Sequence, residues 1–526
     1  MRRTNVFRLW LFAIVIGAAA GYGVIAFRLA IDAVSMIAFG APEPEVASGA
    51  RSLDFGRAWA APVIGGFCVS GLLFLAQKYG WLKEGKSEGV AEVIEARAVG
   101  DARISSRAGL ASAVVTAVSL GSGASAGREG PAVHLGATIA SVIDRHFGFN
   151  AQQRRALLGC GAAAAVSASF NAPIAGVLFA LEVVLGNYAL SLFGPIAAAS
   201  VVAAIVTRTY LGDFPAFAPP PYGDVSNFDV PLAALLGLLC GLLAAGFMSL
   251  TNRMTNGSRL FAQSFGIPFY LLPPIGGVAV GLIGAFYPEV FGVGYEAVTN
   301  ALSGAYTLQM LIILVVAKSV ATAITVSSRF GGGVFAPGLV IGVFAGAAFG
   351  VALSQLTDAA TASPVYYAMV GMGAVGGAIL GAPISTTLIV FELTGDYGIT
   401  ISLMVAVALA TLVVQALIGK SFFHWQLSRR GYDLSEGPQG IILQTIRVRD
   451  VMEPAPPGAP LEEGEKRLKS SDSLGEALAK LRGNNEHGLP VVDGEKRDSV
   501  IGYLSRVKAL AAYNRALIED NIEHHR

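Results

Sequence analysis

The chain has 526 residues, with 37 basic and 36 acidic side chains and a formal net charge of +1. This balance excludes a nucleic acid or another acidic polymer as the expected partner. Hydrophobic residues make up 54% of the chain and charged residues 14%, whereas soluble domains carry about 25% charged residues. The composition therefore indicates an integral membrane protein.

Apolar stretches of nearly bilayer-spanning length recur from Leu9 to Ile418, and several are too short to cross unless they tilt or break. Arg2, Arg3 and Arg8 precede the first stretch, which has no small-residue cleavage site. We expect a retained span, and hence a multi-pass protein of the plasma (inner) membrane with a cytoplasmic N-terminus. Because the polar tail is also expected in the cytoplasm, the number of crossings should be even.

The cysteines and histidines give no sign of a metal site. The cysteines lie far apart in apolar stretches, which argues against a disulfide framework or a zinc site. The histidines lack metal-like clustering, so we expect each to pack or lie at an interface. A hydrolytic triad and a nucleotide-binding glycine loop are also lacking, so we expect neither a cofactor nor an enzyme. The residues considered are Cys68, Cys160, Cys240, His134, His424 and His487.

The segment AGREGPAVHLG (126–136) places Arg128 and Glu129 side by side inside an apolar region, between Gly127 and the pair Gly130–Pro131. Broken helices occur within membranes where their backbone lines a cavity. A helix that begins at Gly-x-x-Gly-Pro presents unpaired N–H groups and a partial positive charge. The segment therefore predicts a helix N-terminus that attracts an anion, unless its proline only kinks a packed helix.

An internal repeat favours the first of these interpretations. Residues 171–182 (NAPIAGVLFALE) and 381–392 (GAPISTTLIVFE) share Ala-Pro-Ile at an offset of 210, and each ends in an acid, Glu182 or Glu392. GSGASAGREGPAVHLGA (121–137) has a counterpart in SRFGGGVFAPGLVIGV (328–343), with Pro131 and Pro337 offset by 206. Two matches at nearly one spacing predict a duplication. Duplicated halves with broken segments are typical of transporters that bind their substrate at the repeat interface.

The motifs GREGP (127–131), GGVFAP (332–337) and APIAGVLFALE (172–182) resemble signature elements of the CLC family of chloride channels and chloride/proton antiporters. The resemblance covers about residues 1–430. It implies an all-helical homodimer, an inverted-repeat bundle with broken helices in which each subunit has its own anion pathway. We therefore expect chloride or a similar small anion as the substrate.

The resemblance also implies roles for individual residues. Glu129 would be the gating glutamate, whose carboxylate competes with the anion and swings away when protonated or displaced. Val334 and Phe335 would offer backbone N–H groups to the central anion. Gly127 and Gly130 allow close backbone approach to the anion, and Arg128 adds positive potential. An ion pair between Arg128 and Glu129 is the poorer interpretation, because adjacent helical residues do not face each other.

Three positions depart from the family pattern. The motif that is typically Gly-Ser-Gly-Ile-Pro-Glu reads SEGVAE (87–92), so Glu88 replaces the serine that holds the central anion. Glu88 either faces that site, where it would repel chloride unless protonated, or points into a wet vestibule near Lys83, Glu84 and Lys86.

The other two departures concern Phe423 and Val183. Phe423, in GKSFFHWQL (419–427), occupies the place of a tyrosine whose hydroxyl contacts the anion, and phenylalanine has no donor. Val183 follows Glu182 where antiporters carry a second acid, so the inner proton-relay position is lost. A site with few side-chain donors should bind anions weakly, which suits rapid passage.

These departures favour a channel-like pathway that is passive or weakly coupled to protons and gated by Glu129. The alternative within the family is a chloride/proton antiporter with a non-standard inner relay such as Glu88. A remote alternative is a divalent-cation channel, because some of these carry similar tails. Such a pore would need clustered acids, whereas Glu129, Glu182 and Glu392 are far apart in the sequence.

The residues after the membrane region are polar. We expect a transport domain at 1–430, a linker at 431–446, and a single CBS-like motif with the C-terminal tail at 447–526. Because CBS motifs fold in pairs, each subunit of a dimer is expected to contribute one. Ser505 is followed three residues on by Lys508 rather than an acid, which argues against nucleotide binding and for a structural tail.

Overall fold

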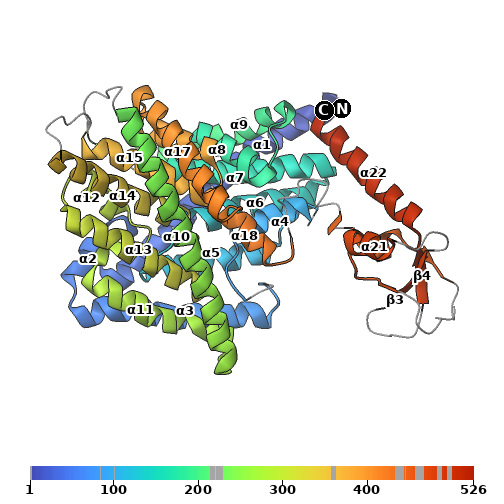
Figure 1. The fold of residues 1–526 in the computed structure, drawn as a ribbon, viewed down its shortest axis with the longest axis horizontal. Helices are drawn as coiled ribbons and strands as arrows, with labels where there is room; N and C mark the ends of the chain where they lie inside the picture. Colours follow the sequence, from blue (N-terminus) through green and yellow to red (C-terminus); the bar gives the residue numbers. More distant parts are fainter. Residues whose placement is uncertain are drawn as a thin grey trace. The chain divides into compact units, whose positions relative to one another are not determined.

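The computed structural model describes residues 3–82, 85–99, 101–213, 220, 229–356, 363–432, 443–444, 446–455, 467–482, 488–493 and 500–525. It forms two compact units, Met1–Phe423 and His424–Arg526. The first unit is helical, and the second contains a small sheet with helices (Figure 1). The predicted fold class, a helical membrane bundle followed by a small α/β tail, is confirmed.

The first unit consists of two consecutive runs of helices (Figure 1). The first run contains α1 (Arg3–Phe39), α2 (Val46–Ser52), α3 (Phe55–Lys78), α4 (Val90–Ala98), α5 (Ser106–Gly121), α6 (Glu129–Phe147), α7 (Ala151–Phe170), α8 (Pro173–Phe179), the π-helical η2 (Ala180–Leu185) and α9 (Leu190–Leu211). The second contains α10 (Asp229–Ser264), α11 (Leu272–Phe286), α12 (Tyr295–Leu302), α13 (Leu308–Ser327), α14 (Phe335–Leu356), α15 (Pro364–Leu380), α16 (Pro383–Thr394) and α17 (Tyr397–Leu417), and α18 (Phe422–Ser428) begins at the end of the first unit and continues into the second. Short 3₁₀ turns occur at Glu43–Glu45, Phe269–Leu271 and Pro288–Val290.

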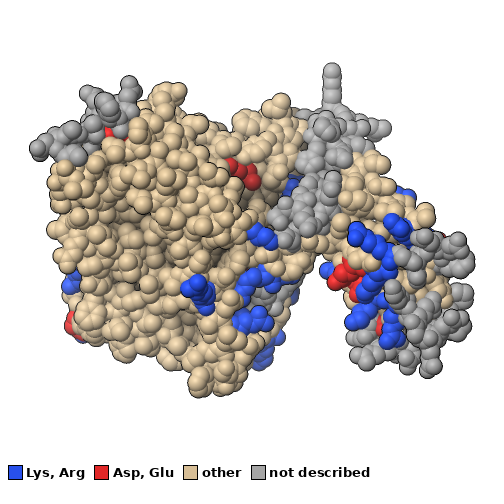
Figure 2. Space-filling model, in the orientation of Figure 1, with Lys and Arg blue, Asp and Glu red and all other residues tan. Residues whose placement is uncertain are grey.

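Eight helices in the described part of the chain are long and apolar enough to cross a membrane. Three shorter apolar helices, at Pro173–Leu185, Pro364–Leu380 and Pro383–Thr394, are among the broken segments that the sequence predicted. Figure 2 shows few charged side chains over most of the visible face of the first unit. A surface of this kind suits contact with lipid rather than water.

Glu182 and Glu392 lie at equivalent positions of the two repeats, and each forms hydrogen bonds to the other repeat. Glu182 accepts hydrogen bonds from the backbone N–H groups of Ile384 (3.1 Å) and Ser385 (2.8 Å), at the start of α16. Glu392 accepts from Ile174 (3.0 Å) and Ala175 (2.7 Å), at the start of α8. Each repeat thus supplies a carboxylate to the helix N-terminus of the other, where anions are stabilised. This reciprocity is what a two-fold relation between inverted halves requires.

Glycines allow equivalent helix pairs to pack backbone against backbone. A Cβ atom added to Gly136 of α6 would lie 2.2 Å from the carbonyl oxygen of Gly161 of α7. A Cβ atom added to Gly342 of α14 would lie 2.2 Å from the carbonyl oxygen of Gly371 of α15. Gly136 and Gly342 are 206 positions apart, and Gly161 and Gly371 are 210 apart, the two offsets of the repeat. The excess of glycine therefore serves close helix packing.

The second unit contains a four-stranded sheet in the order β1-β4-β3-β2. Strands β1 and β3 pair with β4 in antiparallel fashion, while β2 pairs with β3 in parallel. Ser505, at the position considered for ribose recognition, accepts a hydrogen bond from the N–H of Lys508 (3.2 Å). The elements are α20 (Val448–Val451), β1 (Glu453–Pro454), β2 (Leu468–Lys469), α21 (Leu474–Lys480), β3 (Leu489–Val492), β4 (Val500–Leu504) and α22 (Arg506–His525), around a core that includes Val448, Leu474, Val491 and Leu504.

Candidate functional site

Two loops that precede broken helices meet in the interior of the first unit. The N–H of Gly127 donates to the carbonyl oxygen of Gly333 (2.7 Å), and the N–H of Gly333 donates to that of Gly127 (2.8 Å). Gly127 precedes α6 and Gly333 precedes α14, so this bridge brings two helix N-termini together. Both helices begin with unpaired N–H groups and carry partial positive charge at this end. The arrangement can bind an anion, as the sequence predicts.

A third helix N-terminus joins this junction. A Cβ atom added to Gly89, the N-cap of α4, would lie 3.9 Å from the Cα of Gly130. A Cβ atom added to Gly130 would lie 3.9 Å from the Cα of Gly333. The backbones of α4, α6 and α14 therefore approach one another through glycines, where side chains would keep them apart. We call the meeting point of Gly89, Gly127, Gly130 and Gly333 the glycine junction.

Glu129 is the first residue of α6, and its side chain is buried at the glycine junction. A Cβ atom added to Gly127 would lie 2.6 Å from the Oε2 atom of Glu129 and 3.0 Å from the backbone nitrogen of Ala336. The carboxylate thus lies beside the start of α14, where the first backbone N–H groups of the helix have no partner within the helix. A negative charge that is held by helix N-termini can exchange with another anion.

Val334 and Phe335 lie at the N-terminus of α14, where the resemblance places backbone donors. The carbonyl of Val334 accepts the first helical bond, from Gly338 (3.0 Å), so the helix begins at this point. The ring of Phe335 stacks on Phe179 at 5.9 Å and meets the edge of Phe170 at 5.3 Å. These rings fix the start of α14 and form an apolar wall beside the glycine junction.

Arg128 is buried, and its guanidinium group lies against Tyr295 and near Glu43. Its guanidinium carbon lies 4.8 Å from the centre of the Tyr295 ring, and its Nη1 atom lies 3.9 Å from Oε2 of Glu43. The other oxygen of Glu43 accepts a hydrogen bond from the N–H of Val293 (2.9 Å). Arg128 is therefore held by a carboxylate and an aromatic face, and contributes positive potential next to Glu129.

A cavity of about 490 Å³ opens on the side of Arg128. It offers both signs of charge, because two arginines and two glutamates lie in its wall. Phe170, whose ring meets Phe335, also lines the cavity, which therefore reaches the aromatic wall of the glycine junction. The lining residues include Arg28, Arg128, Glu45, Glu296, Phe170, Asn171 and Tyr295.

Glu88 contacts His134, a residue that the sequence predicts to pack or to lie at an interface. The Oε2 atom of Glu88 lies 3.1 Å from Nε2 of His134, one turn of α6 beyond Gly130. The Glu88 side chain is 16% exposed and the His134 side chain is 0% exposed. The N–H of Glu88 donates to the hydroxyl of Ser112 on α5 (2.9 Å). Of the vestibule residues considered with Glu88, Lys83 and Glu84 lie outside the described residues.

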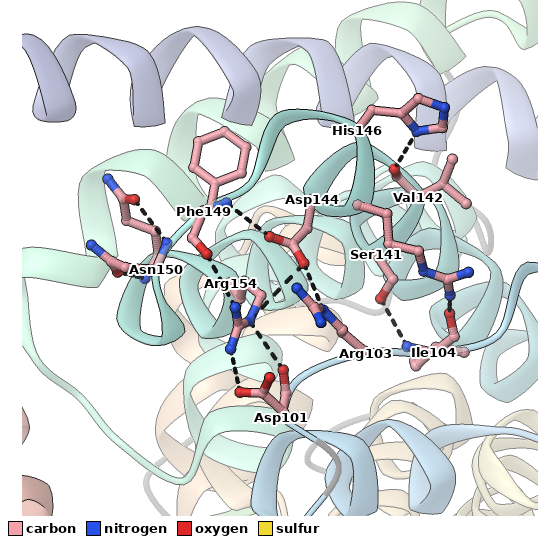
Figure 3. Close-up of polar contacts among 12 residues, drawn as sticks. Asp101, Arg103, Ile104, Ser141, Val142, Asp144, His146, Phe149, Asn150 and Arg154 are labelled. Atoms are coloured by element: carbon pink, nitrogen blue, oxygen red, sulfur yellow. Dashed lines mark hydrogen bonds and ion pairs between the residues drawn. The ribbon is translucent and has the colours of Figure 1, made fainter.

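The far end of α6 is anchored by a polar network (Figure 3). Asp144, which is buried, accepts hydrogen bonds from the Nε of Arg103 and the N–H of Phe149, both at 3.1 Å. Arg154 of α7 donates to the carbonyl oxygens of Phe149 (3.1 Å) and Asp101 (3.2 Å). The network ties α6 to α7 and to the loop after α4. It therefore holds α6 and the end of α4 in place, and both of these helices begin at the glycine junction.

Val183 lies in the π-helical segment η2 and is partly buried. Both oxygens of its neighbour Glu182 are occupied by the N-terminus of α16. Glu182 therefore joins the first repeat to the start of α16 in the second. The sequence pattern gave no sign of this role beyond the matching position of Glu392 in the second repeat.

Phe423, the last residue of the first unit, is 6% exposed and packs against the ring of Phe422 at 6.4 Å. If Phe423 lines the anion path, Phe423→Tyr adds one hydroxyl donor to a charged ligand. Such a bond is worth roughly 1.5–3 kcal/mol, so we expect chloride binding to tighten about tenfold or more. Calorimetry of the purified variants measures this change.

The neighbouring substitution Phe422→Tyr is the matched control for this prediction. Successive side chains of a helix point about 100° apart, so Phe422→Tyr should leave chloride affinity unchanged. If Phe423→Tyr brings no gain either, Phe423 does not line the site and the assignment of the last helix is wrong.

Sequence reasoning missed three buried residues near the glycine junction: Glu43, His134 and Tyr295. Each contacts a residue that is distant in the sequence or lies on another element. The position of His134 in the GREGP helix, five residues after Glu129, was the one available signal. His487 lies outside the described residues.

Comparison with known proteins identifies the family. The sequence profile described as Voltage gated chloride channel matches residues 65–415. The putative chloride channel protein ClcB-like of Ralstonia nicotianae is 34% identical over 422 residues, 80% of this chain and 96% of that protein. The H(+)/Cl(-) exchange transporter ClcA of Salmonella agona is 31% identical over 313 residues, 59% of this chain and 66% of that protein.

Solved structures show the same fold. A slow cyanobacterial Cl-/H+ antiporter superposes with a TM-score of 0.71 at 23% identity, covering 80% of this chain and 98% of that one. A eukaryotic CLC transporter gives 0.65 at 19% identity, covering 97% and 89%. The profile match ends before the C-terminal tail, so the CBS-like motif remains a prediction. Because the profile spans more than half of the chain, the protein belongs to the voltage gated chloride channel (CLC) family of membrane anion-transport proteins.

Proposed function

We propose that the protein conducts chloride, or a similar small anion, through a pathway gated by Glu129, with passive or weakly proton-coupled flux. The observation that carries this proposal is the position of the Glu129 carboxylate. It is buried at the glycine junction, beside the backbone nitrogen of Ala336 at the N-terminus of α14. A chloride ion that enters from the cavity beside Arg128 would compete with it for the same partial positive charges.

The weak coupling to protons rests on the lost relay acid. Val183 cannot ionise, and Glu182 is engaged with the N-terminus of α16. A proton that reaches Glu129 from one side thus has no acid on this segment to receive it. Glu129 can therefore respond to pH without carrying protons across the membrane.

The alternative is a chloride/proton antiporter in which Glu88 replaces the inner relay. Glu88 is partly exposed and lies near the glycine junction, which favours this reading. The relatives include a protein named as a putative chloride channel and one named as an H(+)/Cl(-) exchange transporter, so both functions occur among similar chains. A divalent-cation channel is disfavoured, because the described residues contain no group of three or more His, Cys, Asp or Glu side chains that could hold a metal ion.

The proposed setting is a homodimer in the plasma (inner) membrane with both termini in the cytoplasm. In this arrangement each subunit contributes one CBS-like motif, and the tail stabilises the dimer rather than binding a nucleotide. The contacts of Ser505 favour a structural role for the tail. Its hydroxyl accepts a hydrogen bond from the N–H of Lys508 in α22, and Lys508 stands where an acid would bind the ribose of a nucleotide.

Flux through proteoliposomes tests the proposed function. A chloride gradient should drive anion efflux once a potassium ionophore removes the opposing voltage, while a sodium gradient should drive no current. Nitrate and fluoride gradients in the same assay rank the anions. Sodium or calcium flux without anion flux would exclude the proposal and support the cation channel.

Crossed chloride and pH gradients separate the two anion-transport mechanisms. We expect the chloride gradient to drive little or no uphill proton movement, and the reversal potential to follow chloride alone. If protons are pumped, Glu88→Gln should abolish proton movement while chloride flux continues, because an amide of the same size does not titrate near neutral pH. Strong pumping that survives Glu88→Gln would exclude both the channel-like pathway and Glu88 as the alternative relay.

A further inference from the structure

The contact between Glu88 and His134 is a buried titratable pair that the proposed gate does not use. Nε2 of His134 lies 3.1 Å from Oε2 of Glu88, within ion-pair distance. His134 is completely buried, and the carboxylate of Glu88 is the charged group within ion-pair distance of its ring among the described residues. An imidazole that is held beside a carboxylate can form an ion pair with it by taking up a proton.

The pair lies next to the proposed anion site. Glu88 precedes Gly89, and His134 follows Gly130 by one turn of α6, so both belong to segments that form the glycine junction. The loop that carries Glu88 is fixed to α5 by two contacts. The hydroxyl of Ser112 accepts a hydrogen bond from the N–H of Glu88, and the hydroxyl of Thr116 lies 3.1 Å from the hydroxyl of Ser87. Glu88 therefore stays near His134.

The surroundings offer the pair no stronger partner. Among the described residues, Glu88 is the acid within ion-pair distance of His134. Lys86 lies 3.7 Å from Glu92, which itself accepts from the N–H of Gly89 (2.6 Å). The charged or titratable side chains on the elements packed around the pair include Lys86 on its own loop, Glu92, Glu95 and Arg97 on α4, Arg107 on α5, Glu129, Asp144, Arg145 and His146 on α6, Arg154 and Arg155 on α7, Arg8, Arg28 and Asp32 on α1, and Arg329, which donates to the carbonyl oxygen of Gly85 (3.2 Å).

We propose that His134 takes up a proton when an anion occupies the glycine junction, and thereby neutralises Glu88. With a neutral imidazole the pair carries one negative charge and repels the anion. With an imidazolium the pair is neutral, and the helix N-termini hold the anion unopposed. The proton enters through Glu88, whose side chain is partly exposed, and returns to solvent when the anion leaves.

This inference rests on the proposed function, and it adds a regulation of the same site. Imidazole is the side chain that most readily gains or loses a proton near neutral pH. Because linkage is reciprocal, a proton that strengthens anion binding is itself bound more tightly when the anion is present. Chloride affinity should therefore increase as the pH falls, up to about tenfold per pH unit, which is the limit for one linked proton.

The test uses the full chain with Glu129→Gln, which removes the titration of the gate. Chloride affinity is measured by calorimetry between about pH 5.5 and 8.5, roughly the range in which imidazole titrates. We expect the affinity to rise as the pH falls. Adding His134→Gln should weaken binding about tenfold at the acidic end and flatten the pH profile. Adding Glu88→Gln to that double variant should restore the affinity, because the uncompensated charge is gone.

His146→Gln is the matched control, because His146 lies on the same helix but is exposed and contacts the carbonyl oxygen of Val142. It should leave the pH profile unchanged. A purely structural role for His134 would give no recovery on adding Glu88→Gln, and this outcome would overturn the proposal. Intact chloride binding with a flat profile in Glu129→Gln would also overturn it while leaving the proposed function in place.

A second measurement needs no substitution at His134 and covers the case in which such variants do not fold. Chloride is added to weakly buffered Glu129→Gln protein with a pH indicator, and the proton uptake is recorded. We expect uptake of up to one proton per bound chloride. Chloride binding without proton uptake would contradict the linkage, whereas a complete lack of chloride binding and flux would contradict the proposed function itself.

Discussion

Glu129→Gln is expected to increase chloride flux by roughly tenfold to a hundredfold at neutral pH. The carboxylate and the anion compete for the same helix N-termini, and a hydrogen bond to a charged group is worth roughly 1.5–3 kcal/mol. Protonation neutralises the carboxylate, so wild-type flux should rise as the pH falls. Glutamine does not titrate, so flux through the variant at saturating chloride should be nearly independent of pH. Proteoliposome flux from acidic to basic pH measures both effects.

Glu45→Gln is the matched control for the gate. Glu45 is an exposed acid in the wall of the cavity beside Arg128 and is not one of the residues that form the glycine junction. It should retain the pH response of the wild type. If Glu129→Gln retains the response as well, the gate is not Glu129.

Gly136→Ala is expected to reduce the stability of the membrane unit by at least about 3 kcal/mol, the upper end of typical overpacking costs. The new Cβ atom would lie 2.2 Å from the carbonyl oxygen of Gly161, so two helix backbones must separate. Backbone atoms cannot rotate away as a flexible side chain would. Thermal unfolding in detergent, followed by size-exclusion chromatography, measures the loss, and Gly342→Ala in the second repeat should behave alike.

Gly246→Ala is the control for this prediction. Gly246 lies within α10, and a Cβ atom added there meets no heavy atom within 4 Å. Alanine is more favourable than glycine in a helix by roughly 0.5–1 kcal/mol, so this variant should be as stable as the wild type or more so. Equal thermal stability for Gly136→Ala and Gly246→Ala would show that the helix contact is not tight.

Much of the site could be predicted because its chemistry lies in the backbone. Gly127 and Pro131 indicate where a helix begins. The N-terminus of a helix carries a partial positive charge whatever the surrounding fold. The repeat then indicated that a second N-terminus, at Pro337, would meet the first. The glycine bridge between the two loops agrees with this expectation.

The side-chain partners could not be predicted in the same way. Arg128 pairs with Glu43 and stacks on Tyr295, and these residues come from two other segments of the chain. Glu88 meets His134 because α4 and α6 pack together, a contact that no local pattern encodes. Long-range contacts of this kind depend on the folded arrangement, and a single sequence shows only their separate members.

The two repeats carry different residues at equivalent positions near the bridge between Gly127 and Gly333. Glu129 and Phe335 are both two residues beyond their bridging glycine, so the duplication would by itself give both repeats the same side chain. Two carboxylates facing each other across one pair of backbone bonds would repel, and one of them would have to hold a proton. An acid on one side and an aromatic ring on the other avoids this conflict. The bridged framework is thus symmetric in its backbone, but only the first repeat places an ionisable side chain at this position.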